Sequence, residues 1–195
     1  MHVIIYGATQ SLLQKSGYSH DMTPVKVTFN QVERELRKRN FGILGTLSRK
    51  GRSHSVGVLY GVSPPNKSLA LYVMTGRDTR KARNIANNPN VSFAIPLPRR
   101  LLTFIPPNCI QFQGTAEIIP LEDEGGRQAF SATMILREIL KYADKIAEVQ
   151  NEKICFIRIY PDPVIFTYGL GVSWIELREH LENAASRVEI PAEYR

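Results

Sequence analysis

The chain has 195 residues, of which 43% are hydrophobic and 22% are charged, and its net charge is +7. These proportions are typical of a globular protein and exclude collagen, a disordered chain and a disulfide-stapled miniprotein. No apolar run approaches the roughly 20 residues that span a bilayer. The apolar start, residues 3–6, is too short for a signal peptide.

The length predicts one domain with appendages. Residues 1–27 are weakly patterned, and we expect an N-terminal arm or extension there. Residues 28–40 are predicted to form a helix. Thr28 and Gln31 have the spacing of a capping box, in which each side chain bonds to the backbone of the other residue.

Short runs of apolar residues joined by Gly, Pro and Asn turns follow this helix. Such a pattern is typical of antiparallel strands. We expect up to seven of them, at residues 41–48, 53–60, 68–75, 91–95, 109–119, 154–160 and 164–168. Gly114, inside the fifth strand, predicts a bend or bulge.

Helices are predicted between and after the strands. We expect a short helix from residue 78 or 79 to 86, helical structure over 121–150 with a break near Gly125–Gly126, and a final amphipathic helix over 174–185. A basic, proline-bearing loop is expected at residues 96–107. Six or seven antiparallel strands with inserted helices indicate a small barrel of the α+β class rather than a βαβ sheet.

The positive charge is concentrated in one part of the chain. Residues 34–100 hold 14 Lys and Arg against two acids, whereas residues 101–195 hold 9 basic and 14 acidic residues. This asymmetry indicates an anionic partner, which could be a nucleic acid, a membrane surface or a small phosphate-bearing ligand. A solvated basic face without a ligand is the alternative, and composition does not choose between them.

Cysteine and histidine show no pattern of a redox or metal site. Cys109 and Cys155 lie far apart in no metal-binding or redox spacing, so we expect reduced, buried thiols in a cytoplasmic protein. The four histidines are isolated and lack metal-ligand spacing, so no metal site is predicted.

The most informative segment runs from a strand ending at Thr75 to a helix opening with Thr79, Arg80 and Lys81. The first turn of a helix presents unpaired N–H groups and a partial positive charge, so basic residues there are locally unfavourable. Hydroxyls, cations and N–H groups together can bind a phosphate. The alternative is a solvated helix start with incidental basic residues.

This segment resembles the flavin-binding core of the pyridoxamine 5′-phosphate oxidase-like split barrels. In that family a strand ends in Thr, Ser/Thr-Arg-Lys opens a helix, and Asn-Asn-Pro-x-Val-Ser leads into the next strand. Here these are Thr75, Thr79-Arg80-Lys81 and residues 87–92. The hairpin over 45–60 and the run Gln113-Gly-Thr-Ala-Glu117 are also similar, so the resemblance covers roughly residues 28–168.

The resemblance implies a fold and a domain organisation. It predicts an α+β fold, a split β-barrel of six to seven antiparallel strands with inserted and C-terminal helices. Residues 1–27 would be the arm, residues 28–168 the flavin-binding split barrel, and residues 169–195 a C-terminal helix and tail.

The resemblance also implies an FMN-binding flavoprotein. It would be a cytoplasmic, homodimeric oxidoreductase with a small-molecule redox substrate and neither nucleic acid nor membrane as partner. No catalytic acid or base is identified. Thr75 and residues 79–81 would hold the phosphate and ribityl tail, and residues 54–60 would run along the flavin ring. The implied cofactor-binding residues are His54, Ser55, Tyr60, Met74, Thr75, Thr79, Arg80, Lys81 and Trp174.

The sequence departs from the oxidase itself. Ser55 and Tyr60 stand where the oxidase carries Arg and Lys on the ring-binding strand, and the C-terminal signature that grips pyridoxal phosphate is absent. We therefore do not predict vitamin B6 synthesis. Trp174 could stack on the flavin or be an ordinary core residue at a helix start. His54 could contact substrate or lie in a surface turn.

Three other functions stay open at this point. The same barrel could bind a deazaflavin or heme, as other members of the family do. The protein could also bind a flavin without catalysis. A nucleic-acid binder would use the basic region, but the chain lacks the interleaved aromatic and basic residues typical of single-strand binders.

Overall fold

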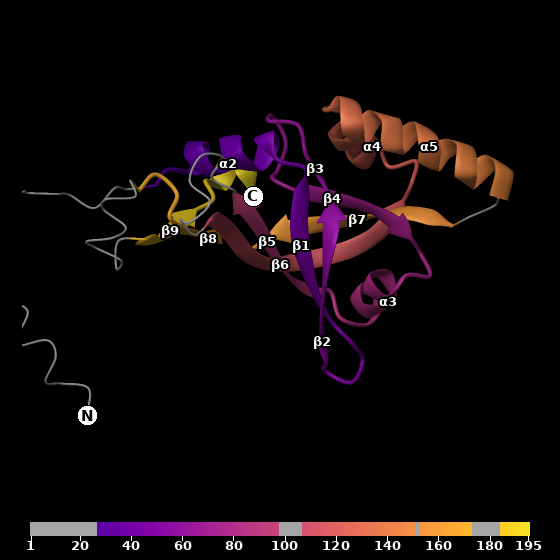
Figure 1. Ribbon diagram of the computed structural model, residues 1–195, viewed down its shortest axis with the longest axis horizontal. Coiled ribbons are helices and arrows are strands. Elements are labelled where there is room, and N and C mark those ends of the chain that lie inside the picture. The colour runs from indigo at the N-terminus through magenta and orange to yellow at the C-terminus, as the bar shows by residue number, and fades with distance from the viewer. Residues whose placement is uncertain (1–26, 98–106, 151–152, 173–183) are drawn as a thin grey trace, which may run out of the picture.

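The computed structural model describes residues 27–97, 107–150, 153–172 and 184–195. Within these ranges a strongly curved antiparallel sheet carries helices on its faces and ends (Figure 1). Its helices are α2 (Phe29–Lys38), α3 (Arg80–Asn87), α4 (Glu124–Ser131), α5 (Met134–Gln150) and the short 3-10 helix η2 (Ala192–Tyr194). Its strands are β1 (Phe41–Leu47), β2 (Ser53–Leu59), β3 (Gly61–Val62), β4 (Leu71–Gly76), β5 (Asn90–Leu97), β6 (Asn108–Pro120), β7 (Ile154–Pro161), β8 (Val164–Tyr168) and β9 (Ala185–Glu189).

The order of the strands explains why the barrel is split. The sheet runs β2-β1-β5-β6-β7-β4-β3, with β8 beside β6 and β9 beside β8. Although β3 follows β2 almost directly in the chain, it pairs with β4, as Gly61↔Tyr72 and Val62↔Leu71. Among the described strands, β2 pairs with β1 alone. The two ends of the sheet therefore meet at β3 and separate along β2 and β4.

Two apolar clusters fill the two sides of the sheet. Inward-facing residues such as Leu44, Phe93 and Ile157 pack with α2 in the larger cluster. The smaller cluster joins α4 and α5 to the other face of β4 and β7, through residues such as Tyr72 and Phe156. Because successive strand residues point to opposite faces, β4 and β7 contribute to both clusters.

The predicted starts of α2 and α3 are confirmed. Thr28 accepts a hydrogen bond from the Gln31 backbone N–H at 3.4 Å, and the Gln31 side chain accepts one from the Thr28 N–H at 2.9 Å, which completes the capping box. Of the two candidates for the next helix start, Thr79 is the N-cap of α3. Both helices bury their apolar face against the sheet.

The antiparallel α+β split barrel is confirmed, and its seven predicted strands are all present. The strand expected from residue 68 begins at Leu71. Two short strands were not predicted, because β3 has only two residues and β9 lies where the final helix was expected to end. The rest of that helix, over 174–183, lies outside the described residues, as do residues 1–26 and 98–106.

The predicted helix break at Gly125–Gly126 is wrong. Both glycines lie in the first turns of α4, where the Asp123 carboxylate accepts a hydrogen bond from the Gly126 N–H at 2.8 Å. A Cβ at Gly126 would collide with the buried ring of Phe156, so glycine here lets α4 approach β7 closely. The helices separate instead before α5, where the Thr133 hydroxyl accepts from the Leu136 N–H at 3.4 Å.

Gly114 also allows a close approach, here between β6 and β7. The register of β6 is continuous through this residue, which faces Val91 of β5 on one side and Pro161 of β7 on the other, so no bulge occurs there. A Cβ at Gly114 would collide with the carbonyl of Tyr160. Glycine thus lets β6 pass from one set of neighbours to the next while the sheet curves (Figure 1).

Three expectations concern the chain as a whole. No helix in the described ranges is long and apolar enough to cross a membrane. Both cysteines are free thiols, and Cys155 is buried as expected, whereas Cys109 is only half-buried. The described ranges hold no group of three or more His, Cys, Asp and Glu side chains that could bind a metal ion.

Candidate functional site

A groove of about 380 Å³ opens where β2 and β4 separate, and we call it the split groove. One wall is the edge of β2, and the opposite wall is the end of β4 together with Lys81 of α3. The helices α4 and α5 close a third side with apolar side chains. The lining residues are Gly57, Val58, Leu59, Met74, Thr75, Gly76, Lys81, Phe130, Ile139, Tyr142, Ala143, Ile146 and Ile154.

At the polar end of the split groove, the hydroxyl of the lining residue Thr75 lies next to that of Thr79 at the start of α3. The Oγ1 atoms of Thr75 and Thr79 are 3.1 Å apart, within hydrogen-bond distance. Thr79 also accepts from the Ala82 N–H at 3.5 Å, which fixes the first turn of α3. No acidic residue lies in that turn, and the nearest carboxylate in the sequence is the exposed Asp78, just before the N-cap.

Lys81 adds a half-buried cation to this end of the groove. Burial lowers the pKa of its ammonium, because a charged group loses hydration on leaving water. No carboxylate of the described residues forms an ion pair with it. Arg80 is exposed at the same helix start. We call Thr75, Thr79, Arg80 and Lys81 the anion clamp, since their donors have no anion of the described chain to bind.

Cys155 packs beneath the anion clamp without being a reactive group. It faces Thr75 across the β4–β7 register, and its thiol donates to the Thr75 carbonyl at 3.4 Å. The thiol is fully buried, and burial raises its pKa. A neutral, inaccessible thiol supports the strand pair and is unsuited to act as a nucleophile.

The structure brings five of the predicted cofactor-binding residues together at the split groove. Met74, Thr75 and Lys81 line it, while Thr79 and Arg80 complete the anion clamp beside it. These five residues come from the segment that carried the resemblance, and the strand-loop-helix connection is short enough to keep them close.

The other predicted residues lie elsewhere. Ser55 lines a second hollow on the outer face of the sheet. His54 is half-buried on β2, and its Nδ1 has no hydrogen-bond partner in the described part of the chain. Trp174 lies outside the described residues.

Tyr60, also among the predicted cofactor-binding residues, lies in the core and does not line the split groove. Its side chain is fully buried, its hydroxyl donates to the carbonyl of Leu36 at 3.0 Å, and its ring meets Phe93 edge-on at 5.5 Å. Burial raises the pKa of the phenol. Alternation along β2 places Val56, Val58 and Tyr60 on the core side, and of these three Val58 alone lines the split groove.

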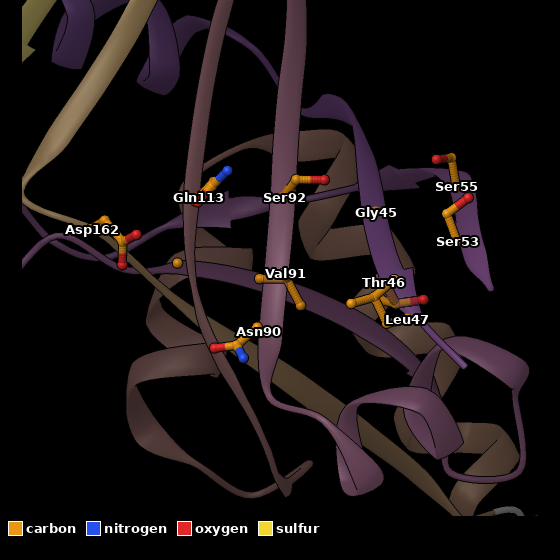
Figure 2. A pocket seen from close by; sticks show the side chains of 11 residues that line it. Gly45, Thr46, Leu47, Ser53, Ser55, Asn90, Val91, Ser92, Gln113 and Asp162 are labelled. Atoms are coloured by element: carbon orange, nitrogen blue, oxygen red, sulfur yellow. The ribbon is translucent and has the colours of Figure 1, made fainter. Parts of the chain in front are cut away.

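The second hollow is polar and also measures about 380 Å³. Its centre is a row across four strands, in which Ser55 faces Gly45, Gly45 faces Ser92, and Ser92 faces Gln113. Figure 2 shows Ser92 and Gln113 on neighbouring strands, with Ser53 and Ser55 to one side and Asp162 to the other. Apart from Asp162 the lining is uncharged, so this hollow lacks the cations of the split groove.

The helical wall of the split groove was not predicted. Ile139, Tyr142 and Ile146 lie on one stripe of α5, and α4 contributes Phe130. A signal was present, because Ile135, Ile139, Tyr142 and Ile146 are spaced by three or four residues, next to the buried stripe of Leu136, Leu140 and Ala143. An apolar band wider than the core needs is a mark of a second contact surface.

Comparisons with known proteins bear on this geometry. The sequence matches the pyridoxamine 5′-phosphate oxidase family over residues 29–155. No curated protein sequence matches the chain.

Solved structures with similar folds include HutZ, the heme storage protein from Vibrio cholerae, with 19% identity, a TM-score of 0.57, and coverage of 75% of this chain and 99% of that one. A heme binding protein from Mycobacterium smegmatis has 18% identity and a TM-score of 0.60, over 84% of this chain and 59% of that one. A pyridoxamine 5′-phosphate oxidase-related, FMN binding protein from Nostoc punctiforme has 13% identity and a TM-score of 0.54, over 86% and 90%. At identities this low, the structural similarity shows a shared fold alone.

The position of Tyr60 gives a first testable prediction. Tyr60→Phe removes the hydroxyl that bonds to Leu36 and should lower the free energy of unfolding by about 1 kcal/mol, measured by urea denaturation. Tyr142→Phe is the matched control on an exposed ring and should change stability by less than about 0.5 kcal/mol. Equal stability of Tyr60→Phe and the unaltered protein would contradict the structural role.

Proposed function

The chain belongs to the pyridoxamine 5′-phosphate oxidase family, and on that premise we propose that it binds FMN in the split groove with the phosphate at the anion clamp. The flavin would supply the electron or hydride transfer of an oxidoreductase acting on a small molecule. The observation that carries this proposal is the pair of bonded hydroxyls of Thr75 and Thr79 at the start of α3. Lys81, which lines the groove with Thr75, forms no ion pair with a described residue.

A phosphate monoester suits the anion clamp in both charge and hydrogen bonding. Its oxygens accept hydrogen bonds, and the clamp offers the one hydroxyl proton that the Thr75–Thr79 pair does not use, the Lys81 ammonium, the Arg80 guanidinium and the free N–H groups of the first turn of α3. An anion beside Lys81 would also offset the cost of burying its charge. A neutral ligand would leave that cost in place.

The rest of the split groove suits a flat ring with polar edges. Residues 57–59 present a strand edge whose outer backbone groups are not paired with another described strand, so they can bond to the polar edge of an isoalloxazine. Ile139, Tyr142 and Ile146 supply apolar cover opposite that edge. The residues present therefore fit FMN at both its ends.

Heme in the same groove is the second candidate. Two of the structures with similar folds are those of a heme storage protein and a heme binding protein. Met74 and Tyr142, both in the lining, carry a thioether and a phenol, side chains of the types that ligate heme iron in other proteins. We rank FMN first, because paired hydroxyls at a helix start favour a phosphate.

A deazaflavin with the same phosphate would use the same clamp and is told apart by its spectrum. Oxidation of a reduced nicotinamide by the loaded protein would separate an enzyme from a flavin-binding protein without catalysis. Two free cysteines are consistent with the reducing cytoplasm as its location.

We also propose that the protein is a homodimer joined through the outer face of the sheet. Large apolar side chains on this face are each between 37% and 48% exposed, namely Phe41, Ile43, Leu47, Leu59 and Phe166. Phe41 and Leu59 face each other across the β1–β2 register, so the patch is continuous there. A second copy of the chain would cover it, since such patches are seldom left open in a monomer.

The anion clamp is tested by removing its two cations. Arg80→Ala with Lys81→Ala should weaken FMN binding by about 100-fold or more, because two charge-assisted contacts are lost, and should leave riboflavin binding unchanged. Fluorescence quenching of each flavin on titration measures both affinities. The matched control, Arg49→Ala with Lys50→Ala, removes two charges from the β1–β2 turn. FMN affinity that survives in the clamp variant would refute the clamp.

The dimer is tested by placing a charge on the exposed sheet face. Ile43→Glu should convert the dimer to a monomer in analytical ultracentrifugation, because an unpaired carboxylate would be buried at the interface. Met134→Glu makes the same kind of change on α5, where Met134 is 76% exposed, and should leave the dimer intact. A monomer in the unaltered protein, or a dimer in Ile43→Glu, would argue against this interface.

A further inference from the structure

Helix α3 is attached to both walls of the split groove. Its N-terminus follows β4 in the chain and is held there by the hydroxyl pair of Thr75 and Thr79, 3.1 Å apart. Its middle is held to the opposite side of the groove by a second hydrogen bond, from Asn84 to β1. In Figure 1, α3 accordingly lies beside the ends of β1 and β2.

The bond from Asn84 passes through β1 to β2. The Asn84 Nδ2 donates to the Thr46 Oγ1 at 2.9 Å, and the Thr46 hydroxyl donates to the His54 carbonyl at 3.3 Å. Thr46 and His54 face each other in the β1–β2 register. A chain of two hydrogen bonds therefore links the helix that carries the anion clamp to the strand that forms the other wall.

Both side chains that form this link, Asn84 and Thr46, are buried. Asn84 is 7% exposed and Thr46 is 3% exposed, on an inner face where α3 otherwise buries Ala82 and Ile85. An asparagine buried among apolar side chains is costly unless its amide is bonded in a defined geometry. An apolar residue would fill this position at lower cost, so the polar pair holds α3 in one position rather than adding stability alone.

We propose that Asn84 and Thr46 are positioning residues that fix the anion clamp relative to the β2 edge, so that one ligand can contact both walls. This inference rests on the proposed function, in which the phosphate and the ring of FMN are the two contacts. A ligand that reaches only one wall gains nothing from the link. The pair therefore favours FMN over riboflavin, and it does so without touching either flavin.

The experiment compares the two flavins in variants of the link. Asn84→Ala and Thr46→Val should each weaken FMN binding about tenfold, the loss typical of a buried hydrogen bond, while riboflavin affinity changes less than about twofold. Asn87→Ala is the matched control, because Asn87 is an exposed residue of α3 that bonds only to the Arg83 carbonyl, at 2.6 Å. It should leave both affinities unchanged.

Two additions separate positioning from general destabilisation. Thr46→Ser keeps the hydroxyl and should restore FMN affinity, and the double variant of Asn84→Ala with Thr46→Val should be no weaker than the weaker single variant. Equal weakening of FMN and riboflavin, or additive losses in the double variant, would overturn the proposal.

Hydrogen exchange of the protein without ligand keeps this test independent of FMN. Amides 83–88 of α3 should exchange about tenfold faster in Asn84→Ala than in the unaltered protein, while those of β4 and β7 stay unchanged. If the unaltered protein binds neither flavin, the proposed function fails, and the exchange rates alone then decide whether the link holds α3. Unchanged exchange in α3 would overturn the link as well.

Discussion

The split groove depends on two hydrogen bonds that fix Tyr60 in the core, between the end of β2 and the start of β3. The Tyr60 hydroxyl bonds to the carbonyl of Leu36 and its backbone N–H bonds to the carbonyl of Asn40, so both groups tie this junction to α2 and the segment after it. On either side of this point, β2 pairs with β1, whereas β3 pairs with β4. Tyr60, between β2 and β3, is thus held in the core at the point where the chain changes its partner strand.

The anion clamp contains two features that disfavour the folded state when no ligand is bound. Two basic residues open a helix whose first turn holds no acid, and one of them is half-buried without a counter-ion in the described chain. Each feature disfavours the folded state on its own. Such departures from stable design are concentrated at functional sites, because a ligand supplies the missing partner. The apolar groove beside the clamp makes an amphiphilic anion the natural partner.

Much of the fold could be predicted from local sequence. The capping residues Thr28 and Thr79 set two helix starts, and alternating apolar residues set seven strands. The segment from Thr75 to Lys81 also indicated where the clamp would form, because its residues lie within one short connection. The helix break, in contrast, was misplaced at Gly126, since that glycine makes room for the Phe156 ring, which is distant in sequence.

The face of the sheet on which each side chain of β2 lies was harder to predict. Ser55 and Tyr60 are five residues apart, and strand alternation puts residues at such a spacing on opposite faces, with Ser55 at the outer hollow and Tyr60 in the core. The spacing of apolar residues on α5 shows in the sequence that its apolar band is wider than the core needs. That this band lies beside β2 and β4 depends on tertiary packing, which local sequence does not specify. Asn84 and Thr46 are 38 residues apart in the chain, and their bond is visible only in the folded protein.

The visible absorption spectrum of the purified protein, recorded before and after the addition of FMN, tests the central claim most directly. The account predicts a flavin spectrum, or quenching of the fluorescence of added FMN, and markedly weaker binding of riboflavin, which lacks the phosphate. A colourless protein that leaves FMN fluorescence unchanged would contradict the account. The intense absorption band of heme in place of a flavin spectrum would also contradict it and would assign the split groove to the second candidate.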